Sequence, residues 1–422
     1  MNATAVMINN KYAQQCAAAF GKARQISRII PIRDFNNWTK SVLIKQYLTR
    51  SSGKKDLSVM DMCSGRGGDL KKFSALGKVK YLACVDVSLE SIIEAIMRYN
   101  TMVSGPNNRG LYVADFIWAD VFETVLSKHF IPHKKGLRFD MISCQFALHY
   151  AFESEKRAKA LFQNISDCLS NEGSFIAIFA SKEIILSRLE AAGYSWPSTD
   201  IPPSIGNGLY SVRFTEPFKT DPHESSYGVK YYFELEEAID NIPEYFVDFE
   251  NVRTLCKEFG LVIKKHFATL SDFYNEYFNL HPEPSEAEFF RRMLKNTSKY
   301  LTQEIQRGEN LENSYSDFFD DASEEEQTAQ PTEESGVVEA VDVKMLTDLP
   351  VKYLEVINIY QAVVIGHAQP SSFIEPYTCK SAPVCRRLVD VVNLTPNNIS
   401  REKLRESFSN HFWTPGKGLV KQ

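Results

Sequence analysis

Short apolar segments alternate with segments of helical periodicity between residues 57 and 180, and this alternation constrains the fold most strongly. The strand-like segments are 57–63, 79–87, 111–120, 138–144 and 173–180, and the helix-like segments are 67–76, 88–100 (with Ser88 as N-cap) and 153–169. This order predicts an α/β fold with a mostly parallel sheet that helices cover on both faces. Because ligands of such sheets bind beyond the carboxyl ends of the strands, polar residues at those ends are the first site candidates.

The composition is that of a globular protein. The 422 residues, 44% of them hydrophobic, suffice for one large domain with insertions or for two domains. The longest apolar runs are far shorter than the ~20 residues that cross a bilayer, and the first residues do not resemble a secretory signal. The eight cysteines include no CxxC pair, which favours reduced thiols over a zinc site or a disulfide framework.

The pattern changes after residue 190. Segments 206–214 and 229–235 are expected to pair as antiparallel strands, and 249–260 and 261–268 as a helix and a strand. Residues 308–340 hold eleven acidic and no basic residues, which predicts a disordered insert, and order is expected to return at 353–366. Without that insert the net charge of −5 becomes +6, which suits a polyanionic ligand but is also common on solvated surfaces.

A glycine-rich turn, "DMCSGRGGDL" at 61–70, follows the first predicted strand. Glycines there allow a ligand to approach the backbone, and Asp86 at the end of the next strand can hold a ribose diol. NAD and S-adenosylmethionine both fit this pair of features. The turn lacks the G-x-G-x-x-G spacing of a pyrophosphate loop, and a further acid, Asp120, ends the next strand unit, so S-adenosylmethionine is favoured. On its own, Asp120 is better interpreted as a turn acid.

Two other segments carry polar side chains in apolar surroundings. In "FDMISCQFALHYAFES" (139–154), Gln145, His149 and Tyr150 follow the end of a buried strand. In "RDFNNWTKSVLI" (33–44), Asn36 and Lys40 are four residues apart and share a face beside an apolar helical stripe. Taken alone, that asparagine and lysine are more simply a cap and a solvated side chain.

These segments, together with "GRGGDL" (65–70) and "YFELEEAIDNIPEYFVDFE" (232–250), resemble the eukaryotic mRNA cap (guanine-N7) methyltransferases from Tyr12 to Gly366, apart from the acidic insert. The resemblance implies a class I, Rossmann-like methyltransferase fold with a seven-stranded sheet and a small inserted antiparallel lobe. It also implies methyl transfer from S-adenosylmethionine to N7 of the guanosine of GpppRNA, without a general base or a metal. We further expect a nuclear, monomeric protein that does not bind membranes and that works with capping enzyme or the RNA polymerase II machinery.

The resemblance also assigns residues. On the donor side it implies Lys40, Asp61, Cys63, Gly65, Asp86, Asp120, Gln145 and Tyr150; on the cap side it implies Tyr12, Asn36, Arg66, Arg98, His149, Tyr150, Glu244 and Tyr360. Glu244, His149 and Tyr150 would position the guanine. The chain departs from the family pattern at Cys63 and Ser64, where glycine and cysteine are usual, at Arg66, where lysine is usual, and at Ala180 and Ser181, where Pro-Asn is usual.

The predicted organisation has six parts: an N-terminal helical segment (1–56), the methyltransferase core (57–190), an inserted lobe and return to the core (191–306), the acidic insert (307–345), terminal core strands (346–366) and a C-terminal extension of unknown role (367–422). Two alternatives to an active cap methyltransferase stay open. One is a catalytically weak cap-binding or scaffold protein, with its donor site compromised at Cys63. The other is a related methyltransferase that acts on a small molecule or a protein.

Overall fold

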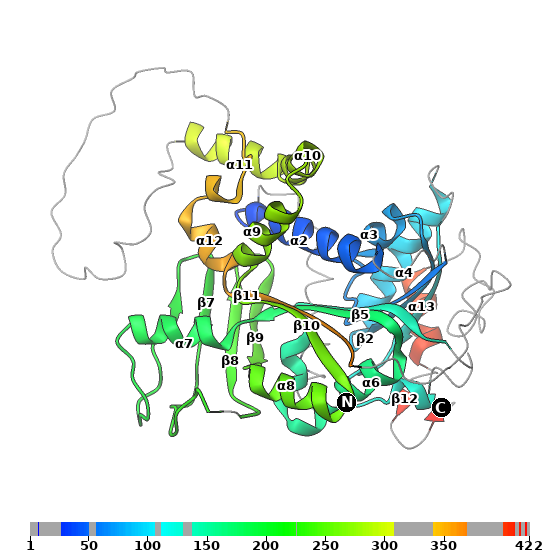
Figure 1. Ribbon diagram of the computed structural model, residues 1–422, viewed down its shortest axis with the longest axis horizontal. Coiled ribbons are helices and arrows are strands. Elements are labelled where there is room, and N and C mark those ends of the chain that lie inside the picture. Colours follow the sequence, from blue (N-terminus) through cyan, green and yellow to red (C-terminus); the bar gives the residue numbers. More distant parts are fainter. Residues whose placement is uncertain are drawn as a thin grey trace.

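A seven-stranded sheet in the order β10-β11-β5-β4-β1-β2-β3 forms the centre of the molecule (Figure 1). The computed structural model describes residues 7, 27–49, 56–105, 111–129, 137–224, 226–307, 341–368, 400–409, 413–414 and 418–419. The strands of the sheet are β1 (Leu57–Met62), β2 (Val79–Asp86), β3 (Val113–Trp118), β4 (Phe139–Gln145), β5 (Leu169–Ala180), β10 (Leu261–Phe267) and β11 (Tyr360–His367). Only β11 runs antiparallel to its neighbours, β5 and β10, so the mostly parallel sheet predicted from the sequence is confirmed.

Two apolar cores lie against the two faces of this sheet. On β5, Ile176 and Ile178 belong to one core, whereas Phe175 and Phe179 belong to the other, as expected for a strand buried on both faces. The helices beside the sheet are α3 (Leu70–Ala75), α4 (Leu89–Ser104), α5 (Leu126–His129), α6 (Glu155–Cys168), α7 (Lys182–Ala191) and α8 (Phe249–Glu258). In Figure 1, α6 and α8 lie on the face opposite α2 and α9.

The helix starts follow local capping chemistry. The Ser88 hydroxyl accepts from the backbone N–H of Ser91, so the predicted N-cap of α4 is confirmed. Helix α3 begins later than predicted, at Leu70, because residues 67–69 form a turn. Gly67 has φ +71°, and a Cβ there would lie 2.6 Å from Leu70 Cδ1, so only glycine fits this turn.

The inserted lobe contains a four-stranded antiparallel sheet, so the predicted antiparallel lobe is confirmed. Its strands are β6 (Ile205–Gly206), β7 (Tyr210–Arg213), β8 (Lys230–Leu235) and β9 (Ile239–Tyr245), paired in that order. The expected strand 206–214 is interrupted at residues 207–209, where Gly208 has φ +76°. A buried ion pair between Lys182 and Asp248 joins the start of α7 to the N-cap of α8, so it ties the two ends of the insert together.

A layer of helices covers the other face of the central sheet. It contains α2 (Ile30–Thr49), α9 (Leu270–Leu280), α10 (Pro284–Met293), α11 (Lys295–Gln306) and α12 (Val351–Ile357), with the short 3₁₀ helix η3 (Leu346–Asp348). The predicted apolar face of α2 is confirmed, because Phe35, Trp38, Val42 and Leu43 are fully buried. The prediction of core strands throughout 346–366 is wrong, because residues 346–357 form η3 and α12 and only β11 is a strand.

Beyond the core, helix α13 (Arg401–Ser409) packs on α4, and β12 (Trp413–Thr414) pairs with β13 (Gly418–Leu419). The predicted disorder of 308–340 falls outside the described residues. Within the described part of the chain, no helix has both the length and the apolar character needed to cross a membrane.

Candidate functional site

The turn after β1 holds the backbone in unusual conformations. Cys63 has φ +59° and Gly65 has φ +51°, both in the left-handed region. That region costs a residue with a Cβ roughly 1–2 kcal/mol, so Cys63 is strained where Gly65 is not. A Cβ added at Gly65 would meet nothing within 4 Å, which leaves open space over the loop. The Cys63 thiol contacts Cys144, and this contact and burial raise the pKa of Cys63.

Lys40 reaches the glycine loop from α2. Its Nζ lies 2.8 Å from Asp69 Oδ1, and the Nζ of Lys72 lies 2.9 Å from the same oxygen. Burial raises the pKa of Asp69, but the two lysines outweigh burial, so the net shift is downward. Asp61 is also buried, and burial together with the charge of Asp69 raises its pKa well above the usual value. Lys40 and Asp61 therefore belong to one cluster of ionisable groups around Asp69.

Asp86 lies at the carboxyl end of β2 and holds the glycine loop through hydrogen bonds. Its Oδ2 accepts from the Gly65 N–H and its Oδ1 from the Ser88 N–H, each at 2.8 Å. Burial raises the pKa of Asp86 to about 6, although both hydrogen bonds oppose that shift. Each carboxylate oxygen retains a lone pair that could accept from a hydroxyl group.

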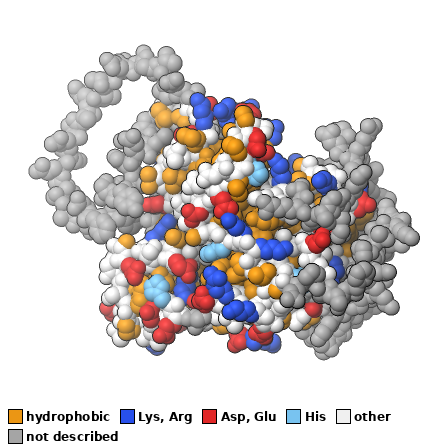
Figure 2. All heavy atoms as spheres, in the orientation of Figure 1, with side chains coloured by type: hydrophobic (Ala, Val, Ile, Leu, Met, Phe, Trp, Pro, Cys, Tyr) orange, Lys and Arg blue, Asp and Glu red, His pale blue; other side chains and the backbone are white. Residues whose placement is uncertain are grey.

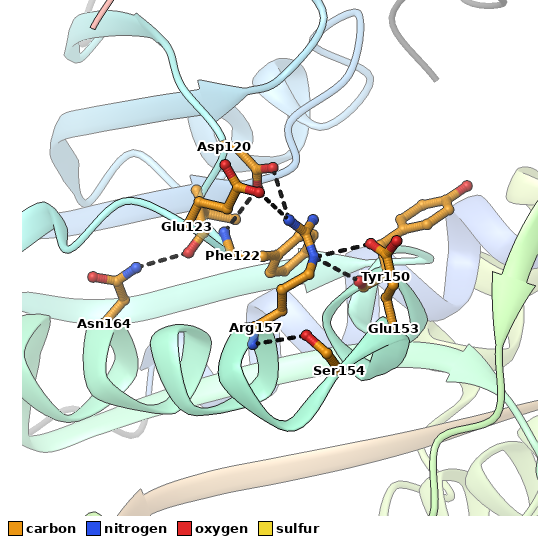
Figure 3. A network of polar contacts seen from close by, with 9 residues as sticks. Asp120, Phe122, Glu123, Tyr150, Glu153, Ser154, Arg157 and Asn164 are labelled. Atoms are coloured by element: carbon orange, nitrogen blue, oxygen red, sulfur yellow. Dashed lines mark hydrogen bonds and ion pairs between the residues drawn. The ribbon is translucent and has the colours of Figure 1, made fainter. Parts of the chain in front are cut away.

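Asp120 takes part in a polar network centred on Arg157 (Figure 3). Asp120 Oδ1 accepts from the Phe122 N–H at 2.9 Å, and Arg157 Nη1 lies 3.2 Å from Asp120 Oδ2. Arg157 also pairs with Glu123 and Glu153, at 3.0 and 3.2 Å, and contacts the Tyr150 carbonyl oxygen. In the structure Asp120 is thus a turn acid with a buried ion pair, which matches the simpler of its two interpretations.

Past β4 the chain turns sharply into the 3₁₀ helix η2 (Leu148–Glu153). Phe146 has φ +57°, and this left-handed residue reverses the chain after Gln145. The amide of Gln145 donates to Ser143 Oγ at 3.1 Å, while its Oε1 is buried and has no hydrogen-bond partner in the structure. The His149 and Tyr150 rings are both buried, 4.3 Å apart between centroids.

Glu244, on β9 of the inserted lobe, faces His149. Its Oε1 lies 3.5 Å from His149 Nε2, and its Oε2 accepts from the Tyr231 hydroxyl at 2.8 Å. Burial raises the pKa of Glu244 to about 8 and lowers that of His149 to about 3. In this structure the carboxyl group is therefore mostly protonated at neutral pH, and the imidazole is neutral.

Aromatic rings complete this side of the site. Tyr360, at the start of β11, packs edge-on against Phe146 with a centroid distance of 4.9 Å. The pKa of Tyr231 is raised by burial, by its bond to Glu244 and by the nearby Tyr360 and Tyr150. The structure therefore brings Tyr150, Tyr231, Tyr360 and Glu244 together from η2, two strands of the lobe and the last strand of the central sheet.

The remaining candidates lie on other elements. Asn36 is one helical turn before Lys40, and its Oδ1 is buried without a hydrogen-bond partner in the structure. Arg66 is partly exposed on the glycine loop, and Arg98 is exposed on α4, where its Nε lies 3.2 Å from Glu94. Tyr12 falls outside the described residues.

Four residues that hold the candidates in place were not predicted from the sequence: Asp69, Lys72, Arg157 and Tyr231. Asp69 and Lys72 could have been found, because they follow the glycines directly and close the same turn. Arg157 contacts Asp120 and Glu123 from another segment of the chain, and Tyr231 contacts Glu244 across the β8–β9 pair, so no local pattern marks these contacts. Among the described residues, no group of three or more His, Cys, Asp or Glu side chains could hold a metal ion.

The polar atoms left without partners indicate where a ligand fits. Buried and without a hydrogen-bond partner in the structure are Asn36 Oδ1, Gln145 Oε1 and both ring nitrogens of His149, although His149 Nε2 lies 3.5 Å from Glu244 Oε1. An unpaired buried polar atom costs about 1–3 kcal/mol, so atoms of this kind suggest contacts that a ligand completes. Together with the space over Gly65 and the free lone pairs of Asp86, these atoms suit the polar groups of a nucleoside.

Known proteins that are similar to this chain are described in the same terms as one another. A profile of the mRNA (guanine-N(7))-methyltransferase domain matches residues 1–329. The chain is 34% identical over 298 residues to the mRNA cap guanine-N(7) methyltransferase of Drosophila melanogaster, covering 69% of this chain and 64% of the relative. It is 35% identical over 276 residues to mRNA cap guanine-N(7) methyltransferase 1 of Oryza sativa subsp. japonica, covering 64% of this chain and 68% of the relative.

The matched length is partial. The chain spans 64% of the Drosophila relative and 62% of the Schizosaccharomyces pombe mRNA cap guanine-N(7) methyltransferase, to which it is 35% identical. Among solved structures, an S-adenosylmethionine-dependent methyltransferase from Clostridium acetobutylicum matches with a TM-score of 0.36 and 16% identity, covering 55% of this chain and 83% of that one. A likeness this distant does not bear on the function.

Proposed function

Because this chain belongs to the mRNA (guanine-N(7))-methyltransferase domain family, we propose that it methylates N7 of the terminal guanosine of GpppRNA, with S-adenosylmethionine as donor. The observation that carries the proposal is the 3.5 Å approach of Glu244 to His149. His149 lies four residues after Gln145, the last residue of β4, so Glu244 places a carboxyl group for the acceptor close to the end of that strand. When bound, S-adenosylmethionine supplies an electrophilic methyl group on its sulfonium.

The donor side would be held by residues around the glycine loop. The lone pairs of Asp86 suit a ribose diol, and Gln145 Oε1 is a buried acceptor without a partner in the structure. Lys40 suits a carboxylate, since it already binds that of Asp69. These residues bind and orient. No residue is required as a general base, because N7 of guanine has a free lone pair.

On the acceptor side, Glu244 as a carboxylate would accept from the N1–H and N2–H₂ groups of guanine. Its charge would also favour the positive base that develops as N7 is alkylated. The Tyr150 and Tyr360 rings would hold the base by its faces and attract it more strongly once it is cationic. Orientation of this kind can supply as much as ~7–11 kcal/mol of barrier reduction.

The charge distribution supports an RNA substrate. Lys and Arg side chains gather over α10 and α11 (Figure 2), where Arg291, Arg292, Lys295 and Lys299 are exposed. Such a surface suits a phosphate backbone through electrostatic attraction that weakens with salt. With this substrate the protein would work in the nucleus, on nascent transcripts. Arg66 and Arg98 are the residues that we assign to the cap triphosphate.

The assay is incubation with GpppRNA and methyl-labelled donor, followed by digestion and identification of the labelled nucleotide. Label in 7-methylguanosine is expected, and Glu244→Ala should abolish it while leaving donor affinity nearly unchanged. One observation favours the alternative of a cap-binding protein with weak catalysis: the strained Cys63 beside the donor loop. Retained GpppG binding without label in the cap would support that alternative, and cap-independent transfer to another acceptor would refute both.

A further inference from the structure

The C-terminal helix α13 docks on α4 through two matched ion pairs. Arg405 contacts Glu90 with Nε and Nη2, at 2.5 and 2.8 Å, and Arg401 pairs with Glu94. Leu404, between the two arginines, is fully buried. Because both arginines and both glutamates are spaced by four residues, each pair of side chains shares one helix face. Helix α13 lies beyond residues 1–329, the range that the family profile matches.

Glu94 is shared between two arginines. Its Oε1 lies 3.2 Å from Arg98 Nε, and its Oε2 is bound by Arg401. Burial raises the pKa of Glu94, but the two arginines outweigh burial and lower it, so Glu94 is ionised at neutral pH. The Arg98 side chain is 47% exposed, whereas those of Arg401 and Glu94 are 19% and 22% exposed. Arg98 therefore presents its guanidinium to solvent while Arg401 is the more enclosed partner.

We propose that Arg401 is a positioning residue, which neutralises Glu94 and so keeps Arg98 available to the phosphates of the capped acceptor. This inference rests on the proposed function, which assigns Arg98 to the cap triphosphate. With all three side chains present, the cluster carries a net charge of +1. Without Arg401 the net charge is zero, and Glu94 can bind Arg98 with both oxygens. The C-terminal extension thereby acts on acceptor binding without contacting the acceptor.

The net charge of the Glu94, Arg98 and Arg401 cluster predicts the order of GpppG affinity among the variants. Arg401→Ala lowers the cluster charge by one, Glu94→Gln raises it by one, and the double variant returns it to the wild-type value. The dissociation constant for GpppG should therefore rise roughly fivefold in Arg401→Ala, the order of one partly exposed ion pair. It should fall below wild type in Glu94→Gln and return to the wild-type value in the double variant. Inorganic triphosphate, as a second probe, should show the same order.

The matched control is Arg405→Ala, which removes an ion pair of the same kind from the same helix interface. Its partner Glu90 lies eight residues before Arg98 on α4, about 12 Å along the helix axis. That distance exceeds the Debye length of roughly 8 Å at physiological salt. GpppG affinity should thus change much less than in Arg401→Ala, and donor affinity should stay constant in both variants.

Recovery of GpppG affinity in the double variant separates the effect of charge from the docking of α13 on α4, because this variant still lacks Arg401. Equal losses in Arg401→Ala and Arg405→Ala, or no rescue in the double variant, would overturn the inference. So would wild-type protein that binds neither probe. If the probes bind in the expected order but no methyl group reaches the cap, the proposed function fails and the role of Arg401 stands.

Discussion

Glu244 predicts a steep pH dependence of cap binding. Burial raises its pKa from 4.5 to about 8, so at neutral pH only about a tenth of the molecules hold the carboxylate that guanine N–H groups need. The observed dissociation constant is the intrinsic one divided by the competent fraction. That fraction rises about 50-fold between roughly pH 6 and pH 8 for a group of this pKa. The affinity for GpppG should improve by about the same factor.

Titration calorimetry with GpppG would test this. In buffers of different ionisation enthalpy, binding near neutral pH should release close to one proton per site. The Glu244→Gln variant should bind GpppG weakly and release no proton on binding, and its affinity should no longer depend on pH. Tyr231→Phe removes the hydrogen bond that opposes the shift, so the pKa of Glu244 should rise further and the midpoint should move to higher pH.

The raised pKa of Glu244 also determines how the stability of the fold changes with pH. The folded pKa of Glu244 lies above the unfolded value, so its contribution to stability is present below about pH 4.5 and is lost as the pH rises through about 8. Glu244→Gln should flatten this part of the pH–stability curve. A dissociation constant that is flat over the same pH range, or a slope that persists in Glu244→Gln, would refute the assignment of this carboxyl group to guanine.

Three further predictions concern the donor side and its support. Cys63→Gly should have a free energy of unfolding about 0.5 kcal/mol above that of Cys63→Ala, because both variants lose the thiol but only glycine relieves the left-handed strain, by more than its chain entropy costs. Denaturant titration of the two variants decides, and an alanine variant at least as stable as the glycine variant would contradict the strain. Arg157→Ala should lower the free energy of unfolding by roughly 3–5 kcal/mol, because it leaves Asp120 buried without its cation. A loss below about 1 kcal/mol in urea unfolding would show that the network in Figure 3 is dispensable. Asp86→Asn should weaken donor binding at least about tenfold, since charge-assisted hydrogen bonds are lost; calorimetry with S-adenosylhomocysteine measures this, and unchanged affinity would remove Asp86 from the ribose site.

Periodicity was sufficient to predict the central sheet. Strands such as β4 are mostly apolar and buried on both faces, and Ser88 marks a helix start through its own hydroxyl group, so local pattern and tertiary structure agree. The pattern failed at 346–366, because α12 and β11 are both apolar and only residues 358–359 separate them. A continuous apolar segment of this kind does not distinguish a buried helix from a buried strand.

The site could be predicted only where its residues lie in motifs. Lys40, Gln145 and Glu244 were found because distinctive strings carry them. Arg157 and Tyr231 were not found, since their importance depends on partners 37 and 13 residues away. The left-handed conformation of Cys63 was also invisible, because only the turn geometry reveals that a Cβ there is strained.

The position of β11 in the sheet affects how the protein can fold during its synthesis. This strand lies between β5 and β10, although it is the last of the seven to be translated. A nascent chain that has emerged only as far as Phe267 therefore exposes an unpaired edge of β5, and β10 has no neighbour to join. It also lacks Tyr360. Neither the sheet nor the aromatic side of the pocket can be completed on the ribosome before that strand leaves the exit tunnel.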